Sequence, residues 1–168
     1  NEVDFALVSV LPDKLNVQGV ELMPNKLIYV CDYNRELSKN PTKKKLFEQI
    51  PLIYREPGSA TRNAMEGFIE QNNFKVNKKM ELTSNEAVKQ AVVSGLGCSI
   101  MPLIGIKNEL LNKDLKIIPV KGLPITTTWN LIWLKSKNLS PAAVAFLNYL
   151  EEKKEEIIKK KFDWIDDF

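Results

Sequence analysis

Short apolar runs alternate with stretches of helical periodicity along most of this 168-residue chain. Runs with the length of buried strands cover residues 4–10, 19–23, 27–31, 52–54, 79–82, 98–101, 115–120 and 126–134. Apolar positions spaced for one helix face predict helices over residues 42–49, 59–71, 84–94, 103–111 and from 140 onward. Strands that alternate with helices predict an α/β fold with a mostly parallel sheet.

The first apolar run, over residues 3–10, begins almost at the start of the sequence without a capping residue or a turn. A nearly continuous apolar run is typical of a central strand in a parallel sheet, which needs a neighbouring strand on each side. We therefore expect the chain to begin partway through a domain.

Three helix starts carry local signals. Thr83-Ser84-Asn85-Glu86 has the spacing of a capping box, in which the Glu86 carboxylate reaches back to a free amide. Ser59 follows a Pro-Gly turn and is placed to cap the helix over residues 59–71, and Ser140-Pro141 pairs a capping hydroxyl with proline at the first helical position. Gly95 or Gly97 is expected to end the helix that begins near residue 84.

Composition excludes several classes of function. Hydrophobic residues make up 44% of the chain, and its net charge of +3 comes from lysines that are spread out rather than banded with aromatic residues, so nothing demands nucleic acid. The chain has no histidine, which removes the usual general base and the commonest metal ligand. No serine lies in a nucleophile elbow. We therefore expect no catalytic residue, no metal and no cofactor, and we interpret the chain as a protein other than an enzyme.

The two cysteines, Cys31 and Cys98, lie far apart without a CxxC motif, so we expect no disulfide framework and a reducing, cytoplasmic location. Cys98 falls in a predicted buried strand, where thiols are usually inert core residues. No apolar run approaches the roughly 20 residues of a membrane-spanning helix.

Two predicted helices begin directly after predicted strands, and both starts are polar. Gly58, Ser59 and Thr61 surround one start, and Ser84 and Asn85 form the other. The carboxyl ends of parallel strands line the ligand crevice of α/β sheets, and free amides at helix starts favour anions. The pattern predicts a site for a small anion or polar metabolite, although an ordinary helix-to-strand unit would produce it as well. Phosphate-wrapping motifs such as G-x-G-x-x-G are absent.

Several segments resemble those of one protein family. The segment YREPGSATR at residues 54–62 is similar to the RExGSxTR motif of LysR-type transcriptional regulators. Further similar segments follow in the family's order: DFAL at 4–7, SNEAVKQAV at 84–92, GLG at 95–97, MP at 101–102 and LSPAA at 139–143. The resemblance extends over nearly the whole chain.

The resemblance implies a ligand-sensing regulatory domain with the two-lobed, α/β fold of type 2 periplasmic binding proteins, the first lobe being incomplete. Residues 1–23 and 123–168 would form lobe I, and residues 24–122 lobe II. The family's effector cleft would draw on six residues: Ser9, Gly58, Ser59, Thr61, Ser84 and Asn85. The resemblance also implies a cytoplasmic homodimer that binds promoter DNA only through a helix-turn-helix domain outside these 168 residues.

Two alternatives share this fold. One is a free-standing solute-binding protein of a transporter. The other is an enzyme that would use Glu56 and Glu86 as an acid–base pair, although the capping role explains Glu86 better. The closing segment FDWIDDF at residues 162–168 is too apolar for a frayed tail. We expect it to dock on the body of the protein or on a partner chain.

Overall fold

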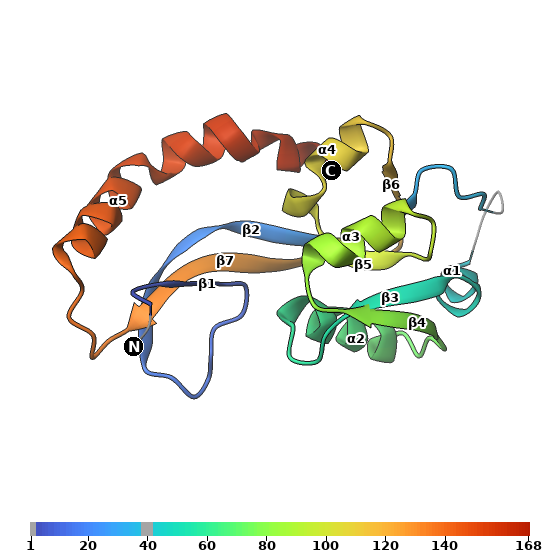
Figure 1. The fold of residues 1–168 in the computed structure, drawn as a ribbon, viewed down its shortest axis with the longest axis horizontal. Helices are drawn as coiled ribbons and strands as arrows, with labels where there is room; N and C mark the ends of the chain where they lie inside the picture. Colours follow the sequence, from blue (N-terminus) through green and yellow to red (C-terminus); the bar gives the residue numbers. More distant parts are fainter. Residues whose placement is uncertain (1–2, 38–41) are drawn as a thin grey trace. The chain divides into compact units, whose positions relative to one another are not determined.

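The computed structural model describes residues 3–37 and 42–168, which form two compact units. The first unit combines the chain through Asn25 with Thr127–Phe168, and the second is the continuous stretch Lys26–Thr126. The chain passes from one unit to the other within β2 (Val17–Asp32) and within β7 (Ile125–Leu134) (Figure 1). The sequence predicted two strands over the residues of β2. The structure has one continuous strand, which includes Pro24.

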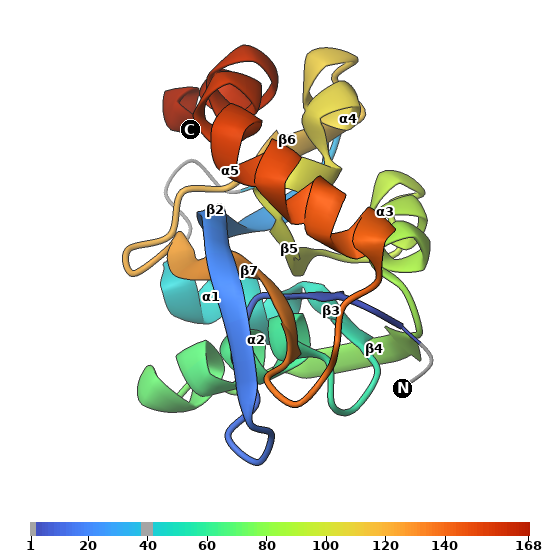
Figure 2. The ribbon, with the colours of Figure 1, turned by 90° about the vertical axis from the view of Figure 1, so that its left-hand side faces the viewer.

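In the first unit, β7 lies between β1 (Ala6–Val8) and β2, and Figure 2 shows β7 and β2 side by side. Gly19 permits this approach, since a Cβ atom there would meet the Leu131 carbonyl oxygen at 2.6 Å. The prediction of a central parallel strand at residues 3–10 is wrong. β1 pairs antiparallel with β7, in the register Leu7↔Leu131, at the end of the strand order, and the Leu7 side chain is 57% exposed.

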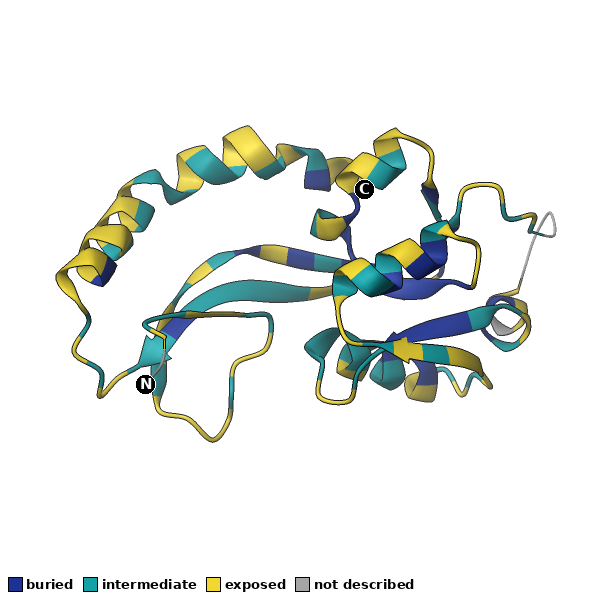
Figure 3. Cartoon of the chain, viewed as in Figure 1, coloured by how far each residue is buried: buried dark blue, intermediate teal, exposed yellow. Residues whose placement is uncertain are grey.

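Helix α5 (Pro141–Phe162) begins as predicted, with the Ser140 hydroxyl accepting a hydrogen bond from the Ala143 amide at 3.2 Å. Only Ala143 is buried, and most of the helix is exposed in Figure 3. The 3-10 helix η2 (Asp163–Asp167) follows and buries Ile165, whereas Phe168 remains half exposed. Within the two described ranges, no helix has both the length and the apolarity needed to cross a membrane.

The second unit holds the remaining elements. Strands β3 (Pro51–Arg55) and β4 (Asn77–Leu82) pair in parallel, whereas β5 (Ser99–Pro102) and β6 (Leu115–Ile117) pair antiparallel with β2. The helical elements are α1 (Lys43–Gln49), α2 (Ala60–Gln71), α3 (Asn85–Val93), η1 (Leu103–Gly105) and α4 (Lys107–Leu111). The prediction of a mostly parallel sheet is therefore wrong. Alternation of helix and strand indicates the layers, but it does not fix the direction of strands that meet across long stretches of chain.

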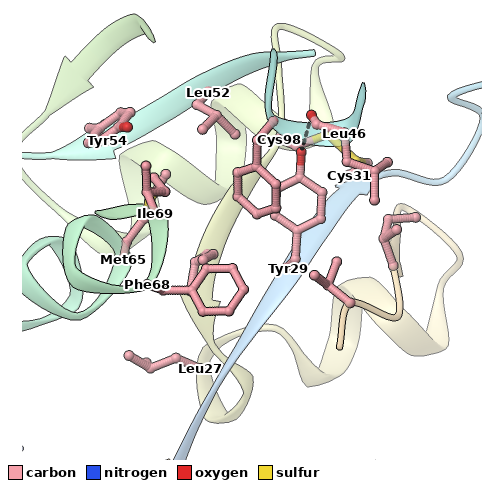
Figure 4. Close-up of a cluster of buried hydrophobic side chains, with 14 residues drawn as sticks. Leu27, Tyr29, Cys31, Leu46, Leu52, Tyr54, Met65, Phe68, Ile69 and Cys98 are labelled. Atoms are coloured by element: carbon pink, nitrogen blue, oxygen red, sulfur yellow. Dashed lines mark hydrogen bonds between the residues drawn. A yellow bond between two sulfur atoms is a disulfide. The ribbon is translucent and has the colours of Figure 1, made fainter. Parts of the chain in front are cut away.

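The core of the second unit is a cluster of buried hydrophobic side chains that includes several packed aromatic rings (Figure 4). The Phe47 ring lies between those of Tyr29 and Phe74, with centroid distances of 4.8 Å and 5.0 Å. The Tyr29 hydroxyl donates a hydrogen bond to the Leu46 carbonyl oxygen at 3.1 Å. Burial of this phenol, against a smaller opposing effect of the Arg35 charge, raises the pKa of Tyr29 well above its ordinary value.

The two cysteines are bonded to each other in the same core. Cys31 and Cys98 form a disulfide across 67 residues of chain, and both are fully buried. The expectation of no disulfide framework and the interpretation of Cys98 as an inert core thiol are therefore wrong. Sequence spacing did not reveal the pair because the contact arises only when β5 lies beside β2. The cysteine count consequently gives no argument for a reducing compartment.

Candidate functional site

The candidate site lies where β3 and β4 end. The two strands are parallel neighbours with Arg55 opposite Leu82, and the Glu56 amide donates to the Leu82 carbonyl oxygen at 3.1 Å. The turns that lead into α2 and α3 therefore leave the same edge of this two-stranded sheet. Parallel strands with a helix after each are the arrangement in which such turns gather around a ligand.

The turn between β3 and α2 is open and polar. Gly58 has a φ of +88°, a conformation that L side chains rarely adopt, and the space around it is empty. Ser59 occupies the N-cap position of α2, as predicted, but its hydroxyl makes no capping hydrogen bond. Thr61 lies half-buried in the first turn of α2. The hydroxyl of Ser59 and the first amides of α2 are thus available to an incoming polar group.

The turn between β4 and α3 differs from the prediction by one residue. Ser84, rather than Thr83, is the N-cap, and its hydroxyl accepts from the Ala87 amide at 3.0 Å. Glu86 therefore lies one position too early to reach back. The capping-box role assigned to it is wrong: its carboxylate binds Lys89 at 2.9 Å and Gln90 at 2.9 Å. The helix ends with Gly95 in the left-handed region, at a φ of +74°.

Arg55 joins the two turns, and sequence analysis missed this role. Its guanidinium donates to the Asn85 side-chain oxygen at 2.5 Å and forms a two-pronged pair with the Glu56 carboxylate at 2.7 Å and 2.8 Å. Bidentate pairs of this kind fix orientation as well as charge. The available signal was the position of Arg55, directly between an apolar strand and an acidic residue.

Arg62 fixes the same region from the first turn of α2. Its guanidinium donates to the Arg55 carbonyl oxygen at 3.1 Å and pairs with Glu66 at 2.8 Å and Glu81 at 3.1 Å. It also lies over the Tyr54 ring, 5.6 Å from the ring centre. The second arginine of the YREPGSATR segment therefore connects β3, β4 and α2 rather than facing a ligand.

We expect Glu56 to remain ionised at all but strongly acidic pH. Hydrogen bonds from the Arg55 guanidinium lower the pKa of Glu56 from 4.5 to about 2. Because the folded-state pKa is depressed, the stabilisation from this pair is fully present above pH 4.5 and is lost progressively as the pH falls from there through about 2. Carbon-detected NMR titration of the Glu56 carboxyl measures this directly. In Arg55→Met the pKa should return toward 4.5, whereas a wild-type value near 4.5 would contradict the pairing.

The structure brings five of the six predicted site residues to this edge of the second unit: Gly58, Ser59, Thr61, Ser84 and Asn85. Ser9, the sixth, lies half-buried just after β1 in the first unit. Two cavities of about 270 Å³ and about 420 Å³ also lie in the first unit, both beside Trp133, and none of the six residues lines them. Within residues 3–37 and 42–168, no three His, Cys, Asp or Glu side chains gather into a possible metal site.

Sequence comparison gives one consistent family. The family model of the LysR substrate binding domain matches residues 1–155. The HTH-type transcriptional activator CmpR of Synechocystis sp. is 41% identical over 142 residues, which cover 83% of this chain and 46% of that protein. A RuBisCO operon transcriptional regulator of Acidithiobacillus ferrooxidans is 34% identical over 89% of this chain and 49% of its own length. The chain thus spans about half the length of the curated relatives it matches.

Solved structures give the same fold. The regulatory domain of Synechocystis CcmR, solved in complex with 2-PG, has a TM-score of 0.79 and 29% identity, over 89% of this chain and 72% of that one. The apo regulatory domain of HypT from Salmonella typhimurium has a TM-score of 0.76 at 17% identity, over 91% of this chain and 73% of its own. The second likeness concerns the fold alone.

Proposed function

Because this chain belongs to the LysR substrate-binding domain family, we propose that it senses a small polar or anionic metabolite as the regulatory domain of a LysR-type transcriptional regulator. Its fold is the type 2 periplasmic-binding-protein-like α/β fold of that family, as the sequence predicted. The alternative of a free-standing transporter component shares the fold. The curated relatives named above are transcriptional regulators, which favours the regulatory domain over the transporter component.

One observation carries the proposed site: two polar helix starts leave the same sheet edge and are joined by Arg55. The Ser59 hydroxyl, the Gly58 backbone and the Asn85 side chain would bind the metabolite there, with Thr61 and Ser84 shaping the turns. Ser9 remains a proposed contact from the first unit. The CcmR regulatory domain was solved with 2-PG, so this compound is the first to test.

Sensing requires the metabolite to bind one state of the protein more tightly than another. We propose that the two predicted lobes change their arrangement between these states. The lobes are residues 1–23 with 123–168, and residues 24–122. We further propose that the whole protein acts in the cytoplasm as a homodimer. Promoter DNA would be bound by a helix-turn-helix domain, which the names of several relatives include.

Isothermal titration calorimetry with 2-PG, followed by a panel of small carboxylates and phosphates, tests the site. We expect saturable binding that weakens about tenfold in Ser59→Ala and at least as much in Asn85→Ala. Each change removes one hydrogen bond to the ligand, and the second also removes the contact between Asn85 and Arg55. Ser94→Ala is the matched control, since its hydroxyl donates to the Gln90 carbonyl oxygen at the far end of α3. If both site variants bind within twofold of wild type, the assignment of these residues is wrong.

A further inference from the structure

The disulfide occupies a junction in the second unit. The antiparallel register of β2 and β5 pairs Val30 with Ser99, so Cys31 and Cys98 are the next pair, with Cα atoms 4.5 Å apart. This spacing is that of a non-hydrogen-bonded antiparallel pair. Figure 4 shows the sulfur–sulfur bond at the margin of the aromatic core. The bond therefore ties the end of β2 to the segment that leads from α3 into β5.

Cys98 is hydrogen-bonded to one element of the candidate site and is joined to the other by a short stretch of chain. Its amide donates to the Pro51 carbonyl oxygen and its carbonyl oxygen accepts from the Ile53 amide, each at 2.9 Å, which joins it to β3. Toward the N-terminus, Gly95 and Leu96 connect it to α3. Breaking the bond at Cys98 would therefore change the position of Arg55 through β3 and the position of Asn85 through α3.

A second, non-covalent tie joins the same two segments. The Arg35 guanidinium donates to the Gly95 carbonyl oxygen at 2.6 Å and pairs with Asp32 at 2.9 Å, and the Lys116 ammonium donates to the Arg35 carbonyl oxygen at 2.6 Å. These contacts do not depend on the sulfur–sulfur bond. Together with the ladder between β2 and β5, they are expected to let the reduced chain keep its fold after the covalent connection is lost.

We propose that Cys31 and Cys98 form a reversible redox modification site and that their redox state changes the affinity of the candidate ligand site. The effect on ligand affinity rests on the proposed function. The exchange partner is a low-molecular-weight thiol and its disulfide, such as glutathione. One protein thiolate attacks oxidised glutathione and releases one glutathione thiolate, leaving a mixed disulfide. The second protein thiolate attacks the protein sulfur of that mixed disulfide and releases a second glutathione. Two electrons pass to glutathione, and the two protons from the cysteines end on the released thiols.

Access to the buried sulfurs requires local opening, and the adjoining turn is suited to it. Residues 94–96 are exposed, and the Leu96 side chain is 45% exposed, although Gly97 and Cys98 are buried. Short exposed turns open at lower free energy than a packed core. The Arg35 tie to Gly95 restrains this opening, so Arg35→Ala should speed reduction of the disulfide several-fold without changing its endpoint.

Thiol trapping in glutathione buffers of varied reduced-to-oxidised ratio tests the site without any ligand. After alkylation, intact-mass spectrometry should show species with either no labelled thiol or two, and reduction should lower the Tm by about 10 °C. Cys31→Ala and Cys98→Ala should each abolish the redox dependence of Tm. Singly labelled wild-type chain throughout, or a Tm that moves by less than about 2 °C, would overturn the modification site.

Calorimetry with 2-PG in the two redox states tests the coupling. We expect the reduced chain to bind 2-PG several-fold more weakly than the oxidised chain. Equal affinities, with thiol trapping as expected, would overturn the coupling alone. A complete lack of 2-PG binding in both states would count against 2-PG as the ligand and against the coupling as stated, while the trapping result would still decide the disulfide.

Discussion

Replacing Phe47 with alanine is expected to lower the free energy of unfolding by about 3–5 kcal/mol. The side chain is fully buried, and its ring packs against those of Tyr29, Phe68 and Phe74 with centroid distances of 4.8 Å, 5.9 Å and 5.0 Å. Removing it leaves a cavity between β2, α2 and the loop that follows α2. A closely packed core does not collapse easily to fill such a cavity. Urea unfolding followed by circular dichroism measures the loss.

Phe146→Ala is the matched control. Phe146 also lies on a helix, but it is 47% exposed and has one ring neighbour, Phe5, at 5.8 Å. Its loss should cost less than about 1.5 kcal/mol, because little of its surface is removed from water on folding. Equal costs for the two substitutions would contradict the placement of the core around Phe47.

Gly97→Ala is expected to destabilise the chain by about 3 kcal/mol, whereas Gly67→Ala should stabilise it by up to about 1 kcal/mol. A Cβ atom at Gly97 would lie 2.4 Å from the Pro51 carbonyl oxygen, which already accepts the Cys98 amide at 2.9 Å. This backbone cannot retreat without breaking the bridge between Cys98 and β3. Gly67 lies inside α2 with open space around it, so alanine there gains helix propensity without a clash.

Chemical denaturation of both glycine variants beside wild type gives the two free-energy changes. The pair is informative because each variant adds the same single methyl group. Opposite signs are expected. A Gly97→Ala protein as stable as wild type would mean that the segment before β5 does not lie against Pro51.

Features that depend on neighbouring residues were predictable from sequence. Ser140 and Pro141 begin α5, Gly95 ends α3 and Ser59 occupies the N-cap of α2, because each signal acts within one helical turn. The fold class came from the resemblance of spaced segments rather than from periodicity, which produced a parallel sheet where most of the pairs are antiparallel. Strand direction depends on which distant segments meet, and a local pattern does not contain that information.

The candidate site shows the same division. The two turns were predictable because strand, polar turn and helix follow one another in sequence. The Arg55 pairing with Asn85 and the bond between Cys31 and Cys98 were not, since 30 and 67 residues separate the partners. The one-residue error at α3 had a local cause: Thr83 and Ser84 both offer a capping hydroxyl, and only the backbone decides which is used.

The most direct test of the account is an amide NMR titration of the isotopically labelled chain with 2-PG. We expect the largest shifts in two clusters, at residues 58–62 and residues 84–87, with smaller changes along the arginine contacts that join them. Saturable shifts centred on the cavities beside Trp133, with both clusters unmoved, would show that the ligand-binding function belongs to a different part of the chain.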